Sequence, residues 1–240
     1  MAVLQITDLN KSFGGLTVTK NLSVTVTDGQ IYGVIGPNGA GKSTLFNQIS
    51  GYIKPDSGQI MFYGKNIVGK PPHQLCHEGI GRTFQIVKPF GSRTVLYNVA
   101  VGAFARTNSR SEALRRAEQV VAMVGLESRK DVLAKNLTIV DRKRLEVAKA
   151  LATQPKLLLL DEVLAGLTPS EVDEAVELIK SIRSAGVTIV MIEHVMRAVM
   201  ALCDRVLVIN YGEPIAEGTP HEVTQNPQVI SAYLGDDHHA

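Results

Sequence analysis

Cysteine and long hydrophobic runs are both scarce in this sequence of 240 residues. Its two cysteines, Cys76 and Cys203, lie far apart and supply no disulfide framework, which is typical of a reducing compartment. A membrane-spanning helix needs roughly 20 predominantly apolar residues, and charged residues interrupt the longest candidate, residues 187–210. No signal peptide is visible, because the N-terminus leads directly into a strand-like alternation. We therefore expect a cytoplasmic protein without membrane-spanning segments.

A strong charge of one sign is missing as well. The formal net charge is only +2 at pH 7, so no basic field is available to attract a phosphate backbone, and nucleic acid is not an expected partner. Hydrophobic residues make up 45% of the chain and charged residues 20%, as in an ordinary globular protein. The length suits one large domain or two closely packed lobes.

The most informative stretch is a glycine-rich loop that follows a short apolar strand at residues 31–35. It has the pattern G-x-x-x-x-G-K-[ST], and helical apolar spacing follows at residues 45–49. Glycines let successive backbone N–H groups converge on an anion, and the start of a helix adds its positive dipole end. The loop consists of Gly36, Pro37, Asn38, Gly39, Ala40, Gly41, Lys42, Ser43 and Thr44.

A glycine-rich turn without function is the alternative interpretation of this loop. The complete motif between a strand and a helix is the context in which it binds phosphate, and this context favours the functional interpretation. Lys42 is then expected to reach the β- and γ-phosphates, and the Ser43 hydroxyl to ligate Mg²⁺. The loop therefore predicts binding of a nucleoside triphosphate.

The surrounding sequence predicts an α/β core that is interrupted by a helical lobe. Residues 1–35 alternate apolar and polar side chains as in antiparallel strands, with turn residues at Asn10, at residues 14–15 and at residues 28–29. The pattern becomes helical further on, where Ser109 and Glu112 predict a capping box. We expect one domain over residues 1–240, with residues 1–87 and 153–240 as the α/β core and residues 88–152 as the helical lobe.

After the helical lobe, strands and helices alternate again. Residues 157–160 are four leucines, and such an all-apolar strand belongs in a parallel sheet that is covered on both faces. Thr168 and Glu171 predict another capping box, with Pro169 at the first helical position. A further buried strand is predicted at residues 187–192.

Polar side chains that could do chemistry follow the strands of this core. Ligands of open α/β sheets bind beyond the carboxyl ends of the strands, where we place Gln85, Asp161, Glu162 and His194. Asp161 is the expected Mg²⁺ partner, and Glu162 is a general base that takes a proton from an attacking water. His194 is expected to bond the γ-phosphate, and Gln85 the water or Mg²⁺.

Each of these candidates has a plainer alternative. The adjacent carboxylates could be solvated charge, and a lone histidine such as His194 is more often structural than catalytic. The four leucines before the carboxylates and the upstream phosphate loop favour the functional interpretation. Phe13 precedes a glycine pair and is either a core aromatic or a flat surface for a purine ring; nothing local decides between the two.

The order of these features resembles the ATP-binding subunit of an ABC transporter over essentially the whole chain. The matching parts are Phe13 (adenine-stacking loop), residues 36–44 (Walker A), Gln85 (Q-loop), residues 157–162 (Walker B with its glutamate) and His194 (switch histidine). The resemblance also implies that Val18 touches the base. Within the family, the chain is most similar to the ATPases of branched-chain amino acid importers, through residues 81–85, 165–169, 216–220, 226–227 and 232–235.

The resemblance implies a P-loop NTPase fold with a mixed sheet core, an N-terminal antiparallel β lobe and an inserted helical lobe. It implies an ATPase that uses ATP and Mg²⁺ to energise an importer of branched-chain amino acids or similar small carboxylates. The implied partners are permease subunits at the inner membrane, a second ATPase subunit and, indirectly, a periplasmic binding protein, with this chain on the cytoplasmic face. A non-transport ABC-type ATPase and a regulatory subunit with weak hydrolysis are the alternatives.

One segment departs from the family pattern. The family signature L-S-G-G-Q corresponds here to residues 137–141, Leu-Thr-Ile-Val-Asp, in which both glycines are missing. In the family this segment meets the γ-phosphate bound to the opposite subunit. Ile139 and Val140 add bulk there, and Asp141 adds a negative charge that Arg142 or Lys143 could offset. We therefore favour a heterodimer with a related ATPase over a homodimer.

Overall fold

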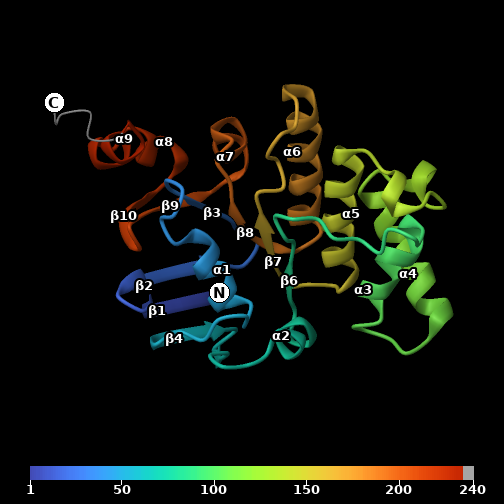
Figure 1. Ribbon diagram of the computed structural model, residues 1–240, viewed down its shortest axis with the longest axis horizontal. Coiled ribbons are helices and arrows are strands. Elements are labelled where there is room, and N and C mark those ends of the chain that lie inside the picture. The colour runs from blue at the N-terminus through green and yellow to red at the C-terminus, as the bar shows by residue number, and fades with distance from the viewer. Residues whose placement is uncertain (235–240) are drawn as a thin grey trace. The chain divides into compact units, whose positions relative to one another are not determined.

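The computed structural model describes residues 1–234. Two compact units make up the chain: one combines Met1–Leu75 with the chain from Thr188 onward, and the other is Cys76–Val187. Figure 1 labels most of their helices and strands. Gly235, which ends the C-terminal part of the resemblance, lies outside the described residues. Among the described residues, no helix combines the length and apolar character needed to cross a bilayer.

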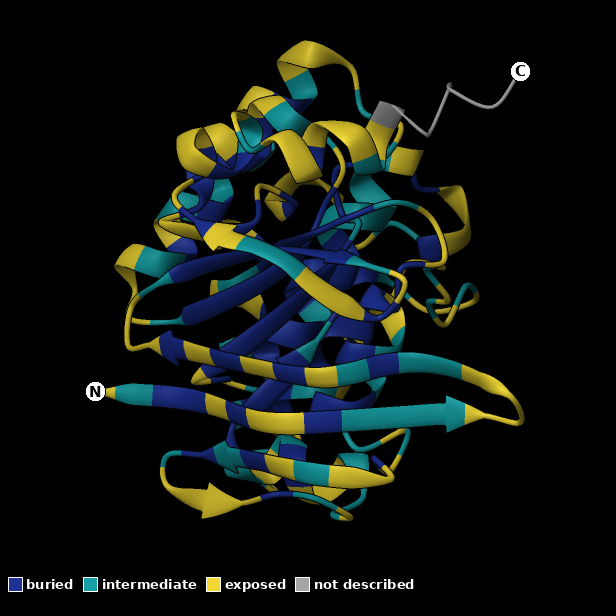
Figure 2. Ribbon diagram, turned by 90° about the vertical axis from the view of Figure 1, so that its left-hand side faces the viewer, coloured by how far each residue is buried: buried dark blue, intermediate teal, exposed yellow. Residues whose placement is uncertain are grey.

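In the first unit, a four-stranded antiparallel sheet contains the N-terminal sequence. Its strands are β1 (Ala2–Phe13), β2 (Leu16–Thr27), β4 (Ser57–Phe62) and β5 (Lys65–Asn66), in the order β2-β1-β4-β5. Buried and exposed residues alternate along much of β1 and β2 (Figure 2). One face of these strands therefore contributes to the apolar core, as the period-2 pattern predicts.

The predicted turn at Asn10 is wrong, because β1 continues past this residue. The pairing with β2 shifts register between Ile6 and Leu9, and Asp8 adopts a left-handed φ of 48°. The Asn10 side chain accepts a hydrogen bond of 2.9 Å from the Asn21 N–H and ties the two strands together at this irregularity. Asn and Asp tolerate such backbone better than most residues, so the polar positions bend the strand without ending it.

The other strands of the first unit are buried. β3 (Ile31–Ile35) pairs in parallel with β8 (Thr188–Ile192) and with β9 (Arg205–Asn210), while β10 (Glu213–Gly218) pairs antiparallel with β9. Every residue of β3 and β8 is buried, which is why both are nearly continuous apolar runs in the sequence. The combination of parallel and antiparallel pairs makes this a mixed sheet.

The helices of the first unit are short. They are α1 (Lys42–Ile49), α7 (Met196–Leu202), α8 (Pro220–Thr224) and α9 (Pro227–Leu234), while α2 (Pro72–Glu78) crosses the division between the units. α1 buries Leu45, Phe46 and Ile49, the apolar positions whose spacing predicts it. Because α1 follows β3 so closely, the glycine-rich loop begins at the carboxyl end of a buried strand.

The second unit holds a parallel pair of strands and the longer helices. The strands are β6 (Ile80–Arg82) and β7 (Leu157–Asp161). The helices are α3 (Val95–Ala103), α4 (Arg110–Met123), α5 (Ile139–Ala152) and α6 (Pro169–Ser184), with 3-10 turns at Glu127–Arg129 and Ala134–Asn136. Helices α3, α4 and α5 pack against one another (Figure 1).

The capping box predicted at the start of α6 is confirmed. The Thr168 hydroxyl accepts from the Glu171 N–H at 3.4 Å, and the Glu171 carboxylate accepts from the Thr168 N–H at 2.7 Å. These reciprocal bonds satisfy two backbone donors that the helix itself leaves without partners. Glutamate in the first turn also suits the positive end of the helix dipole.

The capping box predicted at the start of α4 is only half correct, because one of its two reciprocal hydrogen bonds is absent. Ser109 does cap the helix, accepting from the Glu112 N–H at 3.4 Å. The Glu112 carboxylate, however, binds Arg115 at 2.8 Å and Arg116 at 2.6 Å. Two guanidinium groups one turn along the helix hold this carboxylate with charge-assisted hydrogen bonds, which are stronger than a bond to a neutral N–H.

Candidate nucleotide-binding site

The glycine-rich loop, residues 36–44, has a backbone conformation that glycine adopts readily. Gly36, Gly39 and Gly41 have φ angles of 149°, 80° and 107°. A Cβ on Gly36 would lie 2.0 Å from the Ile209 carbonyl oxygen, and one on Gly41 would lie 2.3 Å from the Val18 carbonyl oxygen. A Cβ on Gly39 would meet nothing within 4 Å. Gly36 and Gly41 are therefore required by conformation and by space, and Gly39 by conformation alone.

Helix α1 begins inside this loop with an N-terminus that no side chain caps. Its N-cap is Gly41, and the first helical residue is Lys42. The Lys42 side chain is buried, and its Nζ donates to the Gly36 carbonyl at 2.7 Å and to the Pro37 carbonyl at 2.8 Å. The loop thus combines the positive dipole end of a helix with an ammonium group held by its own carbonyls. This arrangement suits an anion such as a phosphate.

Among the other residues of the loop, some are held in place by hydrogen bonds or burial and others are accessible to solvent. Buried Ala40 accepts a hydrogen bond of 2.9 Å from the Gly212 N–H, which links the loop to the turn between β9 and β10. Asn38 and Ser43 are exposed, and Thr44 is half-buried in the first turn of α1. The backbone is therefore held while the Asn38 and Ser43 side chains stay accessible to a ligand.

Strand β2 brings Val18 against the same loop. Lys11 pairs with Thr19 and Ser12 pairs with Thr17, so Val18 is the extra residue of a β-bulge. Its carbonyl oxygen occupies the space beside Gly41. The structure therefore brings Val18 to the phosphate loop, while a contact between Val18 and a base stays a prediction.

Phe13 ends β1 and is not a core residue. Its side chain is 49% exposed, and the Lys11 ammonium lies 5.3 Å from the ring centroid. The exposure rules out the core alternative that the sequence left open. Stacking on a purine ring stays a prediction, and an exposed aromatic face can serve it.

His194 lies two residues beyond β8, and its side chain is exposed. β3 and β8 are parallel, with Val34 opposite Ile192. The phosphate loop after β3 and His194 after β8 therefore leave the sheet at the same edge, which is the edge where such sheets bind ligands.

In the second unit, Asp161 is the last residue of β7 and pairs with a cation. Its carboxylate lies 3.0 Å from the Arg82 guanidinium, and both side chains are less than 10% exposed. The Asp161 N–H donates to the Thr83 hydroxyl at 2.9 Å. The sequence prediction missed Arg82. The sequence did contain a signal for this pair, because Arg82 and Asp161 each end an apolar strand and two such strands can run parallel side by side.

The second unit also joins Gln85 to Glu162. The Gln85 amide Nε2 donates to the Glu162 carboxylate at 2.5 Å, although 77 residues separate them along the chain. Glu162 has a left-handed φ of 51°, a conformation that costs a non-glycine residue roughly 1–2 kcal/mol. Such residues concentrate at functional sites, where the surrounding structure enforces them.

The candidates thus form two groups, one in each unit. The first unit contains Phe13, Val18, residues 36–44 and His194, and the second contains Gln85, Asp161 and Glu162. The first group includes an exposed aromatic ring, the glycine-rich loop and a buried ammonium group, and the second includes two carboxylates and an amide.

The segment at residues 137–141 forms the start of α5. Thr138 is the N-cap, and its hydroxyl accepts from the Asp141 N–H at 3.1 Å. Ile139 follows with 70% of its side chain exposed. Arg142 donates to the Lys135 carbonyl at 2.7 Å, and Lys143 donates to the Ala165 carbonyl. Both cations that the sequence offered as compensation for Asp141 therefore bind backbone carbonyls.

The chain matches two family models. The model described as ABC transporter matches residues 19–165, and the model described as branched-chain amino acid ATP-binding cassette transporter matches residues 213–239. A curated relative, the high-affinity branched-chain amino acid transport ATP-binding protein LivG of Salmonella typhimurium, is 41% identical over 98% of each chain. BraF of Pseudomonas aeruginosa, a protein of the same description, is 37% identical with the same coverage.

Solved structures agree with these relatives. A nucleotide-free ATP-binding cassette from an ABC transporter superposes with a TM-score of 0.90 at 31% identity, covering 98% of this chain and 100% of the other. The ADP conformation of another ABC transporter cassette gives a TM-score of 0.89 at 32% identity, covering 98% and 99% of the two chains.

A glycine loop between a buried strand and a helix, with a lysine inside it, defines a P-loop nucleotide-binding protein. The matches identify the class further: the chain belongs to the ABC transporter family of ATP-binding proteins. The predicted fold, with its antiparallel sheet, mixed sheet and helices, is confirmed. Cassettes of this family bind nucleotide and hydrolyse ATP to power transport, and this chain is an ATPase of the family.

Proposed function

We propose that the chain is the ATP-hydrolysing subunit of an importer for branched-chain amino acids or similar small carboxylates. The observation that carries the proposal is the uncapped start of α1, where Lys42 is held inside a glycine loop suited to phosphate. The cargo class is supported by the descriptions of LivG and BraF and by the match at residues 213–239. A binding protein and a permease would select the cargo itself.

We assign nucleotide binding to residues of the first unit. The exposed Phe13 ring stacks on adenine, and Val18 contacts the same base. The backbone N–H groups of the loop and the Lys42 ammonium hold the phosphates. The loop residues with this role are Gly36, Pro37, Asn38, Gly39, Ala40, Gly41, Lys42, Ser43 and Thr44.

The proposed metal is Mg²⁺, which prefers oxygen ligands. The Ser43 hydroxyl, the Gln85 amide oxygen and the Asp161 carboxylate supply a donor set of this kind. Arg82 binds the Asp161 carboxylate at 3.0 Å and so orients it. When bound, Mg²⁺ would neutralise charge on the phosphates.

Hydrolysis is assigned to Glu162, with Gln85 and His194 as its helpers. Glu162 takes a proton from the attacking water, and His194 bonds the γ-phosphate. The Gln85 amide, which donates to the Glu162 carboxylate at 2.5 Å, holds the base and reports the state of the nucleotide. The left-handed backbone at Glu162 supports this assignment, because it is a conformation that functional sites retain.

The test of this function is Glu162→Gln, which keeps the size of the side chain and removes its basicity. ATP hydrolysis is expected to fall on the order of 100-fold or more, while the affinity for ATP, measured with a fluorescent analogue, stays within about twofold because the carboxylate does not bind the phosphates. The matched control is Glu118→Gln on the exposed face of α4, which is expected to hydrolyse ATP like the wild type. Turnover that survives Glu162→Gln would refute the assignment of the base.

The proposed partners are permease subunits at the inner membrane, with the chain bound peripherally on the cytoplasmic face and the periplasmic binding protein engaged only through the permease. Exposed apolar side chains in the second unit support a docking surface for a short permease helix. They are Phe84, Ile86, Phe90, Tyr97, Val101 and Phe104.

We also propose that the chain functions in a heterodimer. The start of α5 supports this, because Ile139 presents apolar bulk and Thr138 uses its hydroxyl as a helix cap, where the family signature approaches a phosphate. A related ATPase with an ordinary signature would complete this chain's nucleotide site. Hydrolysis by the purified chain alone is therefore expected to be well below that of the chain mixed with its partner. A homodimer as active as the mixture would refute the proposal.

A further inference from the structure

A short loop, residues 163–168, connects Glu162 to helix α6 within the second unit. Glu162 has a left-handed φ of 51°, and Gly166 in the loop has a φ of 74°. A glycine adopts such a conformation readily, whereas at a glutamate it persists only where the surrounding structure enforces it. The contacts of this loop are therefore also the contacts that hold Glu162.

Ala165 joins Glu162 to helix α5. Its backbone N–H donates to the Glu162 carbonyl at 3.4 Å, which closes a turn directly after the glutamate. Its own carbonyl accepts a hydrogen bond from the ammonium group of Lys143, in the second turn of α5. A hydrogen bond from a charged donor is stronger than one between neutral groups. One loop residue therefore links a cation of α5 to the backbone of Glu162.

The surroundings of Lys143 are mostly apolar. Its side chain is half-buried, and Leu164 beside Ala165 is only 1% exposed. Partial exclusion of water strengthens the attraction between the ammonium and the carbonyl. Helix α5 and the loop form part of the wall of one cavity, to which they contribute Val140, Lys143, Val147, Val163, Leu164 and Leu167.

The next residue of α5 is also a cation, but it makes a different contact. Arg144 pairs with Glu174 on α6, whose side chain is 63% exposed. An ion pair with so exposed a partner contributes little to stability. Helix α5 thus carries two adjacent cations, one bound to the loop that follows Glu162 and the other to the neighbouring helix.

We propose that Lys143 is a positioning residue for Glu162, so that the first turns of α5 serve hydrolysis in this chain's own second unit. Lys143 lies just beyond residues 137–141, the segment that departs from the family signature. The departure alters the surface offered to a phosphate and leaves the contact with the loop in place. The inference rests on the proposed role of Glu162 as general base.

The test is Lys143→Met, which removes the ammonium group and keeps an unbranched apolar side chain. The kcat for ATP hydrolysis is expected to fall about tenfold, because small displacements of a catalytic group are costly. Backbone amides of residues 163–168 are expected to exchange hydrogen several-fold faster, which mass spectrometry measures independently of hydrolysis. Wild-type kcat, or unchanged exchange in this loop, would overturn the inference.

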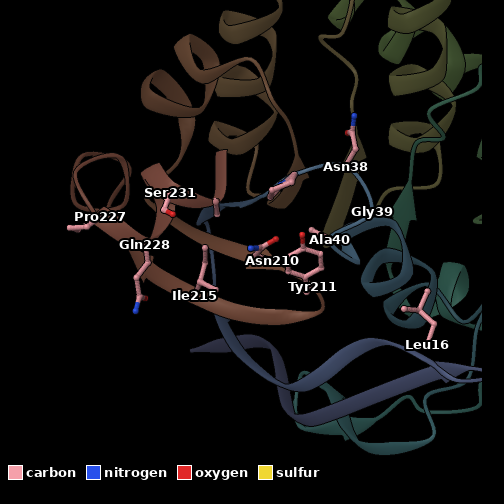
Figure 3. A pocket seen from close by; sticks show the side chains of 12 residues that line it. Leu16, Asn38, Gly39, Ala40, Asn210, Tyr211, Ile215, Pro227, Gln228 and Ser231 are labelled. Atoms are coloured by element: carbon pink, nitrogen blue, oxygen red, sulfur yellow. The ribbon is translucent and has the colours of Figure 1, made fainter. Parts of the chain in front are cut away.

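The affinity for ATP separates positioning of the base from a general loss of folded protein. The residues proposed to bind ATP belong to the first unit, where Asn38, Gly39 and Ala40 of the phosphate loop line a pocket (Figure 3). Lys143 belongs to the second unit. The KM for ATP and the dissociation constant of a fluorescent ATP analogue are therefore expected to stay within about twofold of the wild type.

Two variants serve as matched controls. Lys143→Arg retains a cationic donor and is expected to keep the kcat within about threefold of the wild type. Arg144→Met removes the neighbouring cation and is expected to leave both the kcat and the exchange of residues 163–168 unchanged. An equal loss of kcat in Arg144→Met and Lys143→Met would assign the effect to the packing of α5 and overturn the inference.

Glu162→Gln, measured in the same assay, distinguishes this inference from the proposed function. Hydrolysis that survives Glu162→Gln would refute the proposed function itself. An inactive Glu162→Gln beside a fully active Lys143→Met would refute only the positioning role of Lys143.

Discussion

The starts of helices α1 and α5 present the same physical feature in two different ways. α1 begins after Gly41, and no side chain caps it. α5 begins after Thr138, whose hydroxyl accepts from the Asp141 N–H at 3.1 Å. In both helices the N-terminus is the positive end of the helix dipole, and the first-turn N–H groups have no hydrogen-bond partner within the helix. No side chain caps these N–H groups at α1, whereas the Thr138 hydroxyl accepts from one of them at α5.

This difference shows which features allow the start of a helix to bind a phosphate. Dipole and N–H groups are present in every α-helix, so they cannot specify one. What distinguishes α1 is that no side chain caps its start and that its first residue is a buried cation, Lys42, whose ammonium donates to the Gly36 and Pro37 carbonyls. At α5, Asp141 places a negative charge in the first turn, which suits the helix but opposes a phosphate.

The largest expected effect comes from removing the cation at α1. In Lys42→Ala, ATP hydrolysis is expected to fall on the order of 100-fold or more, because a preorganised positive charge at the phosphates is lost. Steady-state phosphate release measures this. Lys65→Ala, which changes an exposed lysine of β5, is the control and is expected to leave the rate unchanged. Equal rates for the wild type and Lys42→Ala would remove the distinction between the two helix starts.

The second-largest expected effect is on stability and concerns the glycines of the loop at the start of α1. Gly41→Ala is expected to lower the free energy of unfolding by about 3 kcal/mol, because the new Cβ would meet the Val18 carbonyl oxygen at 2.3 Å. Gly39→Ala is the matched control, since its Cβ meets nothing within 4 Å. It is expected to cost only about 1–2 kcal/mol for the left-handed backbone. Urea unfolding of both variants checks the order, and equal losses would contradict it.

At α5 the expected effect is on stability. Thr138→Ala is expected to lower the free energy of unfolding by about 1 kcal/mol, because the first turn loses its side-chain acceptor. Thr138→Ser retains the hydroxyl and is expected to be nearly neutral. Thermal and urea unfolding of the pair measure the cap directly. No loss in the alanine variant would show that the Thr138 hydroxyl does not stabilise α5.

The smallest expected effect is on the pH dependence of stability and concerns the start of a third helix, α4. Hydrogen bonds from Arg115 and Arg116 lower the pKa of the Glu112 carboxyl from 4.5 to about 2. Because the folded pKa is the lower one, the pair stabilises the fold above the unfolded pKa, and this contribution disappears as the pH falls from about 4.5 to 2. Glu112→Gln is expected to show a weaker dependence of unfolding on pH in this window. Unchanged pH dependence would contradict the role of the pair.

Much of the fold could be predicted from local sequence. The apolar runs of β3, β7 and β8 and the complete capping box at α6 are confirmed. The turn at Asn10 and the full box at α4 are wrong, because a register shift against β2 and two arginines change the outcome at those positions. Local pattern rules do not include such competitors.

The site was predictable in its residue types and less so in its contacts. The pattern of residues 36–44 identifies the loop, but the pairing of Arg82 with Asp161 and the bond from Gln85 to Glu162 join residues 79 and 77 positions apart. Such contacts depend on which strands become neighbours. The exposure of Phe13 likewise depends on the sheet around it.

The order of residues alone specifies the phosphate loop, because a glycine at a positive φ and a lysine at a helix start are local requirements that a motif can encode. It also specifies the altered segment at residues 137–141. The folded chain adds the contacts that the motif does not contain: Val18 beside Gly41, and Ile209 beside Gly36. Val18 and Ile209 come from two distant strands, β2 and β9, and only the packing of these strands brings both residues to one loop.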